Sequence, residues 1–150
     1  MAENLDVFAG AGGSVAVAAA LARAAHEGQT DKAGVPYFEH CRGVALKLDD
    51  DDARTVALLH DVLEDTATSE SELRAVFADE IVDAVVAITR LQGEDPDDYY
   101  ERVAANPLAL RVKRADIQHN LEPARLAALD EETRLRLTEK YRKVLAVLSE

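Results

Sequence analysis

Alanine and leucine dominate the apolar residues of this chain, and β-branched residues occur only in short runs. No Asn-Gly or Asp-Gly pair separates alternating apolar segments, so the usual signal for a β-hairpin is missing from the sequence. This pattern predicts an all-α fold. Because 48% of the residues are hydrophobic but only 5% are aromatic, we expect a core of Ala, Leu and Val. The 150 residues are enough for one domain with such a core.

The periodicity and the breakers along the chain predict a single bundle of about seven helices. We expect a flexible lead over residues 1–13, followed by one domain over residues 14–150. The expected helices cover about residues 14–27, 37–48, 53–63, 79–91, 98–103, 107–119 and 130–148, with a short one that ends near 77. Ser14 is expected to cap the first helix and Gly28 to end it, and Thr68 or Ser69 is expected to cap the short helix.

The charge balance is strongly acidic, with 29 Asp and Glu against 17 Lys and Arg and a net charge of −12 at pH 7. Such a surface repels phosphate backbones, so neither a nucleic-acid polymer nor a membrane is an expected partner. The apolar stretch from Val15 to Ala25 is shorter than the roughly 20 residues of a spanning helix. The acidic start lacks the basic end of a secretory signal, and the single Cys41 cannot form an internal disulfide. We therefore expect a cytoplasmic protein, of unknown oligomeric state.

The segment Leu58–Thr66 places an imidazole and three carboxylates within two turns of a largely apolar helix. In a continuous helix His60 lies above Glu64, and Asp61 lies above Asp65. The carboxylates by themselves would fit a solvated helix end, because Asp and Glu are mostly exposed. The apolar residues directly before His60 weaken that interpretation. Adjacent nitrogen and oxygen ligands on one helix instead suit a metal site.

Two further positions could complete such a site. Asp116 and His119 are three residues apart in a predicted helix and share one face. His40 stands near the start of another helix, although a lone histidine is more often a packing residue than a ligand. With His60 and Asp61, His40 and Asp116 would provide two imidazoles and two carboxylates. That set suits a divalent ion such as manganese, iron, zinc or cobalt.

These residues, in this order, resemble the HD phosphohydrolase superfamily. The closer resemblance is to the hydrolase domain of the RelA/SpoT homologues and to the stand-alone small alarmone hydrolases, which remove pyrophosphate from the 3′ position of (p)ppGpp. The resemblance covers about residues 19–129. It is carried by residues 25–29, 32–40, 44–45, 57–66, 88–91 and 112–120.

The resemblance implies an HD-type helical domain with a divalent ion, usually Mn²⁺, as its cofactor. It implies four metal ligands, namely His40, His60, Asp61 and Asp116. It also implies that Glu64 and Asp65 are the catalytic pair that orients and activates the attacking water. A divalent ion lowers the pKa of its bound water, and a neighbouring carboxylate can accept the proton.

The nucleotide is expected to bind beside this metal. Lys32 matches a family lysine near the substrate phosphates, Asn120 matches a residue close to the nucleotide, and Tyr37 is a weaker candidate. Asp31 stands where the long alarmone enzymes have an arginine that contacts the nucleotide. An anion at this position is expected to weaken the binding of a polyanion, or to change which base or phosphate fits.

The expected activity is removal of the 3′-pyrophosphate from (p)ppGpp, which gives GDP or GTP and pyrophosphate. One alternative is an HD-type nucleotidase or pyrophosphohydrolase that acts on another nucleotide, and Asp31 is the reason to keep it. A second alternative, a nucleotide-binding regulatory module without turnover, is less favoured because all four ligand positions are present. In each case the expected partner is a small nucleotide.

Overall fold

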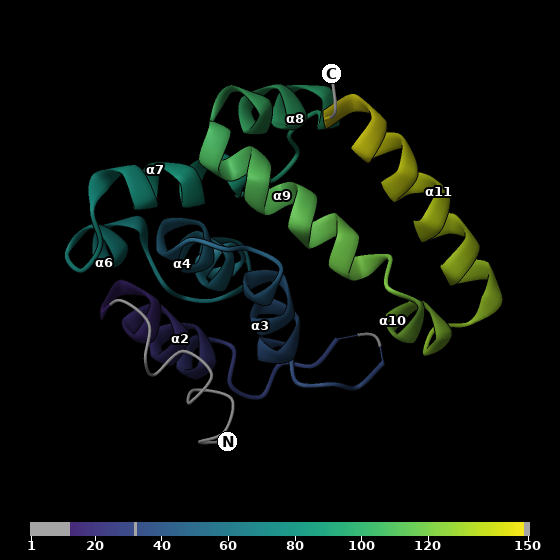
Figure 1. Ribbon diagram of the computed structural model, residues 1–150, viewed down its shortest axis with the longest axis horizontal. Coiled ribbons are helices and arrows are strands. Elements are labelled where there is room, and N and C mark those ends of the chain that lie inside the picture. Colours follow the sequence, from purple (N-terminus) through teal and green to yellow (C-terminus); the bar gives the residue numbers. More distant parts are fainter. Residues whose placement is uncertain (1–12, 32, 149–150) are drawn as a thin grey trace.

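The computed structural model describes residues 13–31 and 33–148, and within these residues every regular element is a helix. The expected all-α class is therefore confirmed (Figure 1). The helices are α2 (Gly13–Ala25), α3 (Phe38–Leu46), α4 (Asp51–Leu59), α5 (Val62–Asp65), α6 (Glu70–Arg74), α7 (Asp79–Ile88), α8 (Pro96–Ala105), α9 (Pro107–Asn120), α10 (Pro123–Ala127) and α11 (Glu131–Leu148). Residues 1–12 of the expected lead, and Lys32, lie outside the described residues.

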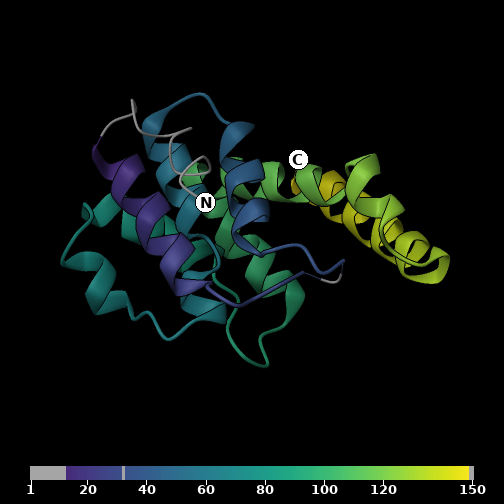
Figure 2. The same ribbon diagram turned by 90° about the horizontal axis from the view of Figure 1, so that it is seen from below.

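Helix α9 lies at the centre of the arrangement. It packs against α3, α4 and α7 on one side, and against α8 and α11. Helix α4 in turn packs against α2, α3, α7 and α9 (Figure 1). Helices α10 and α11 extend beyond the other helices, as the view in Figure 2 shows, and α11 then runs back along α9 toward α8. We refer to residues 123–148, which form α10 and α11, as the C-terminal arm.

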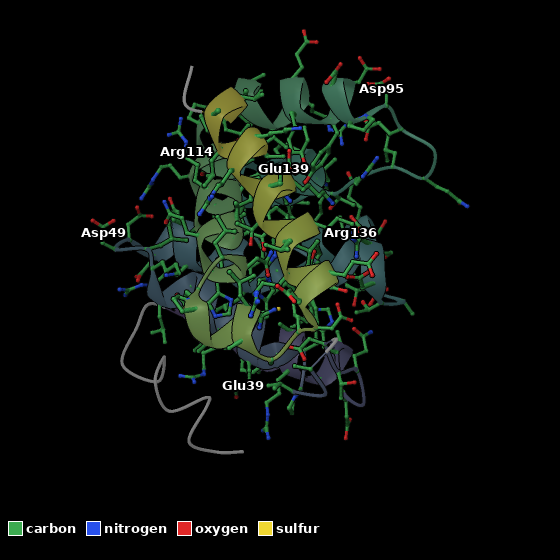
Figure 3. The ribbon with its side chains drawn as sticks, turned by 90° about the vertical axis from the view of Figure 1, so that its right-hand side faces the viewer. Glu39, Asp49, Asp95, Arg114, Arg136 and Glu139 are labelled. Atoms are coloured by element: carbon green, nitrogen blue, oxygen red, sulfur yellow. The ribbon has the colours of Figure 1, made fainter. Side chains whose placement is uncertain are left out.

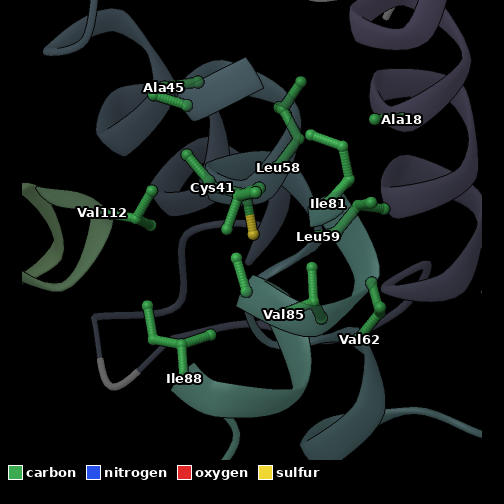
Figure 4. Close-up of a cluster of buried hydrophobic side chains, with 14 of the residues drawn as sticks. Ala18, Cys41, Ala45, Leu58, Leu59, Val62, Ile81, Val85, Ile88 and Val112 are labelled. Atoms are coloured by element: carbon green, nitrogen blue, oxygen red, sulfur yellow. The ribbon is translucent and has the colours of Figure 1, made fainter. Parts of the chain in front are cut away.

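The core consists mainly of small and aliphatic side chains, as expected from the composition, together with the buried aromatic residues Phe38, Phe77 and Tyr99. The largest fully buried side chains are all Leu, Val or Ile, and they include Leu58, Leu59 and Val62. Figure 4 shows Leu58 and Leu59 of α4 among side chains from α2, α3, α7 and α9. From Thr55 to Leu59 every residue of α4 is buried. A helix that is buried all round lies inside the protein, so α4 delivers the residue after Leu59 into the interior.

Side-chain hydrogen bonds cap two helices, α4 and α6, at their first turns. Asp50 accepts a hydrogen bond from the backbone of Ala53 at 2.8 Å and caps α4. Ser69 and Glu72 form a reciprocal capping box at the start of α6. The expected cap at Ser14 is wrong, because α2 begins at Gly13 and Ser14 lies within it.

The expectation of one continuous helix over 53–63 is also wrong, because α4 ends at Leu59 and α5 begins at Val62. In a continuous helix the backbone oxygen of Ala57 would accept from the amide of Asp61. Instead, that oxygen accepts from the backbone amide of His60 at 3.4 Å, and the ring Nδ1 of His60 lies 2.6 Å from it. A local bond from a side chain to the backbone competes with helix propagation, and here it accompanies the break.

The outer side of the C-terminal arm carries mixed charges. Figure 3 shows Arg136 and Glu139 on the exposed side of α11. Lys143 and Glu139 form an ion pair at 3.3 Å one turn apart. No helix within residues 13–31 and 33–148 is both long enough and apolar enough to cross a bilayer.

The contact between α3 and α9 depends on a glycine, and this yields a prediction. A Cβ atom at Gly43 would lie 2.1 Å from Nε2 of His119, which is itself hydrogen-bonded to His40. Gly43→Ala should therefore lower the free energy of unfolding by about 1–3 kcal/mol, as overpacking does. Urea denaturation of the metal-free protein measures the change.

The matched control is Gly13→Ala, where an added Cβ meets nothing within 4 Å. We expect this variant to be as stable as the parent or slightly more stable, because alanine is the better helix former. Equal urea midpoints and slopes for Gly43→Ala and Gly13→Ala would show that the packing of α3 against α9 does not require a glycine at position 43.

Candidate metal centre

Three helices that pack on one another bring the predicted metal ligands together. His40 lies in α3, His60 directly follows α4, and Asp116 lies in α9. One ligand atom from each of these side chains lies within 4.8 Å of the others, and all three residues are buried. Asp61 is not part of this tightest group, but its Oδ2 lies 3.0 Å from Nε2 of His60.

The hydrogen bond of His60 determines which of its two ring nitrogens carries the hydrogen in the neutral ring. Its Nδ1 lies 2.6 Å from the carbonyl oxygen of Ala57, and since a carbonyl only accepts, Nδ1 must carry a hydrogen. In the neutral ring Nε2 then holds a lone pair. This buried atom has no hydrogen-bond partner in the described part of the chain, although it lies 3.0 Å from Asp61 Oδ2 and 3.5 Å from Asp116 Oδ1.

A lone pair that faces two carboxylate oxygens is unfavourable unless a positive charge lies between them. Nitrogen and oxygen donors in this combination suit a divalent transition-metal ion. A backbone carbonyl that holds the far nitrogen of a histidine is also the usual support for a metal ligand. The residues present therefore fit a divalent ion.

The electrostatics of the metal-free centre lead to the same conclusion. Burial lowers the pKa of His60, but the carboxylates of Asp61 and Asp116 more than offset this and raise it well above 6.5. Burial raises the pKa of Asp116, but Lys113 and His60 bring it well below its ordinary value. Against burial, His60 also lowers the pKa of Asp61 to about 2. Without a metal, a proton on His60 supplies the positive charge.

A second histidine supports the position of His40. Nδ1 of His40 lies 2.8 Å from Nδ1 of His119, and Nε2 of His40 lies 2.8 Å from Asp116 Oδ1. Burial and the neighbouring His40 lower the pKa of His119 to about 4, so His119 is neutral at pH 7. His119 therefore acts on His40 as a hydrogen-bond partner and not as a cation.

The carboxylates have partners of their own. Nζ of Lys113 lies 3.1 Å from Asp116 Oδ2, and the hydroxyl of Tyr37 donates a hydrogen bond to Asp61 Oδ2. Burial and the Asp61 carboxylate raise the pKa of Tyr37, so its hydroxyl keeps its proton. The Tyr37 contact fixes the Asp61 oxygen that faces His60, whereas Lys113 holds Oδ2 of Asp116 and leaves Oδ1 toward His60.

A cavity of about 560 Å³ opens on this centre. This volume is in the range of small-molecule sites. It is lined by Tyr37, His40, Asp61, Asp116 and Asn120 from the predicted site, by Thr30, Asp31, Ala33 and Val35 of the loop before α3, and by Ala124, Arg125, Ala128, Leu129, Leu137 and Tyr141 of the C-terminal arm. The cavity thus has a metal end and an end formed by the arm.

Some predicted residues stand apart from this cavity. Glu64 and Asp65 are exposed and do not line it, and Glu64 Oε1 accepts a hydrogen bond from the backbone of Arg90 at 3.1 Å. His60 lies buried and is not part of the cavity lining either. For Lys32 the structure describes no position.

Sequence reasoning missed the contribution of the C-terminal arm. Arg125 lines the cavity from α10, a helix of five residues that begins with Pro123. Leu137 and Tyr141 line it from α11. No motif marks these positions, and the helical spacing of Leu137 and Tyr141 on α11 would have suggested only a buried face.

The comparison with protein families decides the relationship. The HD domain family matches this chain over residues 18–149. The chain belongs to the HD-domain family. The family match agrees with the resemblance that His60, Asp61 and the surrounding segments carry in the sequence.

Two curated relatives show what this HD domain is similar to. It is 32% identical over 139 residues to the "GTP pyrophosphokinase rsh" of Brucella melitensis. This alignment covers 83% of this chain and 18% of that protein. It is 34% identical over 145 residues to the "Guanosine-3′,5′-bis(diphosphate) 3′-pyrophosphohydrolase" of Haemophilus influenzae, covering 86% of this chain and 21% of that protein. The HD domain described here thus spans about a fifth of the length of these relatives.

A solved structure shares the fold. It is described as a metazoan orthologue of SpoT that hydrolyses ppGpp, and it aligns with a TM-score of 0.76 at 23% sequence identity. The alignment covers 91% of this chain and 86% of the other. The arrangement of helices in this HD domain is therefore one that a known structure also adopts.

Competition between a proton and a metal at His60 generates a prediction. Because the carboxylates of Asp61 and Asp116 raise the pKa of His60 and so favour a proton on its ring in the metal-free protein, Mn²⁺ must compete with that proton. Affinity for Mn²⁺ should rise with pH, by up to about tenfold per unit, until the pH passes the raised pKa of His60. Calorimetric titrations in two buffers of different ionisation enthalpy report the number of protons released.

In the same titrations His60→Gln should bind Mn²⁺ weakly and release no proton from this site. The Asp61 and Asp116 pKa values lie below the tested range, so these carboxylates add nothing to the pH dependence above pH 6. Tight binding of Mn²⁺ by the parent protein that is independent of pH and releases no proton would contradict this account of the centre.

Proposed function

We propose that this HD domain is a metal-dependent phosphohydrolase that removes the 3′-pyrophosphate from (p)ppGpp. The observation that carries the proposal is the buried Nε2 of His60, which faces the carboxylates of Asp61 and Asp116 next to a cavity of about 560 Å³. The relative from Haemophilus influenzae, which carries the name of this activity, supports the choice of substrate. The products would be GDP or GTP and pyrophosphate.

In this proposal His40, His60, Asp61 and Asp116 hold a divalent ion, and that ion is Mn²⁺. When bound, such an ion lowers the pKa of a coordinated water and offsets the charge of the phosphate. The protein's own contribution is to hold the donors in place. Tyr37 fixes Asp61 through its hydroxyl, and Lys113 fixes Asp116 through its ammonium group.

Asp65 is the proposed proton acceptor of the reaction. Burial and the nearby carboxylates of Asp61 and Glu64 raise its pKa, which brings the carboxylate closer to the range where it can accept and return a proton. The backbone oxygen of Asp65 accepts a hydrogen bond from Gln29 at 2.8 Å, which holds this turn against the loop before α3. Since Asp65 does not line the cavity, it would act through a water molecule.

Glu64 has a supporting part in the proposal. Its Oε1 accepts from the backbone of Arg90, two residues after the end of α7, so the carboxylate links α5 to the segment that follows α7. Glu64 then adds to the field that raises the pKa of Asp65. Lys32 and Asn120 remain the proposed contacts to the nucleotide, with Lys32 at the phosphates. We place this reaction in the cytoplasm.

Hydrolysis assays with Mn²⁺-loaded protein test the proposal. Incubation with ppGpp should release pyrophosphate and GDP, and His60→Ala and Asp61→Ala should each lower the rate by at least about a hundredfold together with the metal content. Arg74→Ala is the control, because Arg74 pairs only with exposed carboxylates on α6 and α7 among the contacts described. This control should keep both metal and activity.

A panel of other nucleotides separates the alternatives. Turnover of another nucleotide without pyrophosphate release from ppGpp would favour an HD-type nucleotidase of different specificity. Tight nucleotide binding without turnover, with the metal bound, would favour a regulatory module. The same assays with Zn²⁺, Co²⁺ and Fe²⁺ in place of Mn²⁺ test the metal.

The different surroundings of Asp65 and Glu64 predict different effects of substitution. Asp65→Asn should lower kcat by about 10²–10⁴-fold, as loss of a general base does. The parent kcat should rise as the pH passes upward through the raised pKa of Asp65, because only the carboxylate accepts a proton. Glu64→Gln keeps the acceptor for the Arg90 amide and should have a smaller effect. Measurement of kcat from pH 4.5 to 8 gives both results, and equal losses in the two variants would remove the distinction.

A further inference from the structure

Asp31 is not a free anion at the wall of the cavity. Its Oδ1 accepts hydrogen bonds from the backbone amides of Ala33 at 2.9 Å and Val35 at 3.0 Å. Its Oδ2 lies 3.2 Å from Nη1 of Arg125. Both oxygens of this carboxylate therefore have partners inside the protein. The expectation that Asp31 repels a polyanionic ligand neglects these partners.

Arg125 connects the loop before α3 with the metal end of the cavity. Its Nη2 lies 3.4 Å from Asn120 Oδ1, and Asn120 Nδ2 lies 3.4 Å from Asp116 Oδ1. In Figure 1 this loop passes next to α10, from which Arg125 extends. Among the described residues that line the cavity, Arg125 is the only lysine or arginine.

The charge of this pair determines which part of a nucleotide it suits. The side chains of Asp31 and Arg125 are 13% and 26% exposed, so the pair is largely shielded from water and its net charge is zero. A neutral pair attracts a phosphate only weakly. The guanidinium nevertheless has five N–H groups in a planar fork, of which the carboxylate and the amide engage only some.

The lining beyond Arg125 also suits a base. Ala128, Leu129, Leu137 and Tyr141 form the part of the wall that the C-terminal arm provides. In the proposed reaction the scissile phosphates lie at the metal, so the nucleoside must extend toward this apolar wall. Arg125 stands between the two ends, next to Asn120.

We propose that Arg125, oriented by Asp31, selects the nucleobase by donating hydrogen bonds to O6 and N7 of guanine. An arginine fork matches these two acceptors, and adenine presents an amino donor in place of O6. Asp31 is a positioning residue in this arrangement. The inference rests on the proposed function for the location of the phosphates, and it adds the residue that distinguishes guanine from adenine.

Kinetics with the 3′,5′-bis(diphosphates) of guanosine, inosine and adenosine test the inference. The parent protein should prefer guanosine and inosine, because both carry O6 and N7. Arg125→Ala should raise KM for these two by about ten- to a hundredfold, the discrimination that one bidentate arginine contact provides. KM for the adenosine compound should change much less, and kcat should fall far less than KM rises.

Two further variants distinguish a positioning role of Asp31 from a general effect of losing an ion pair. Asp31→Asn keeps the Oδ1 acceptor for the amides of Ala33 and Val35 but removes the charge that holds Arg125, so it should reduce the guanine preference in the same direction. Arg111→Ala removes a guanidinium that also pairs across distant segments, with Asp49 and Asp50, outside this cavity. It should leave the preference unchanged.

Each outcome has a defined meaning. An equal rise of KM for all three nucleotides in Arg125→Ala would assign Arg125 to the phosphates and overturn the inference, as would a result equal to that of Arg111→Ala. Calorimetric binding of GDP, IDP and ADP to the Mn²⁺-loaded protein gives the base preference even without turnover. Guanine preference that depends on Arg125 but without hydrolysis would contradict the proposed function alone, whereas hydrolysis without that preference would contradict this inference alone.

Discussion

The ring of His60 is the element on which the rest of the site depends. Its Nδ1 takes the carbonyl of Ala57 that the next turn of α4 would have used, so the same contact accompanies the end of the helix and fixes the tautomer of the ring. Because α4 is buried from Thr55 to Leu59, the other nitrogen then faces Asp61 and Asp116 away from solvent. A buried lone pair that faces carboxylates is stable only with a metal cation or a proton between them, so the position of His60 determines what this centre can bind.

Much of this could be predicted from the sequence, because the signals involved are local. Helix formers, the cap at Ser69 and the mainly aliphatic core are properties of neighbouring residues or of composition. His60 and Asp61 stood out because they follow an apolar run. The structure brings His40 and Asp116 to them because α3 and α9 both pack on α4.

The parts that sequence reasoning missed depend on competition or on distance. The break after Leu59 is accompanied by a side chain that competes with the backbone for one carbonyl, and helix propensity does not describe such a competition. The pairing of Asp31 with Arg125 joins residues 94 positions apart. The expected stacking of Glu64 under His60 and of Asp65 under Asp61 depends on a continuous helix, whereas α4 ends at Leu59 and both carboxylates are exposed.

The division of the cavity between two parts of the chain has a consequence for how such a protein can diverge. The candidate ligands lie between positions 40 and 116, whereas Arg125, Leu137 and Tyr141 belong to the C-terminal arm. Figure 2 shows how far this arm extends from the remaining helices. Mutations in the arm can therefore accumulate without altering the donors around His60. If the proposed function holds, ligand preference and bond cleavage reside in different parts of the chain, and a duplicated copy can change its nucleotide while it keeps the same metal ligands.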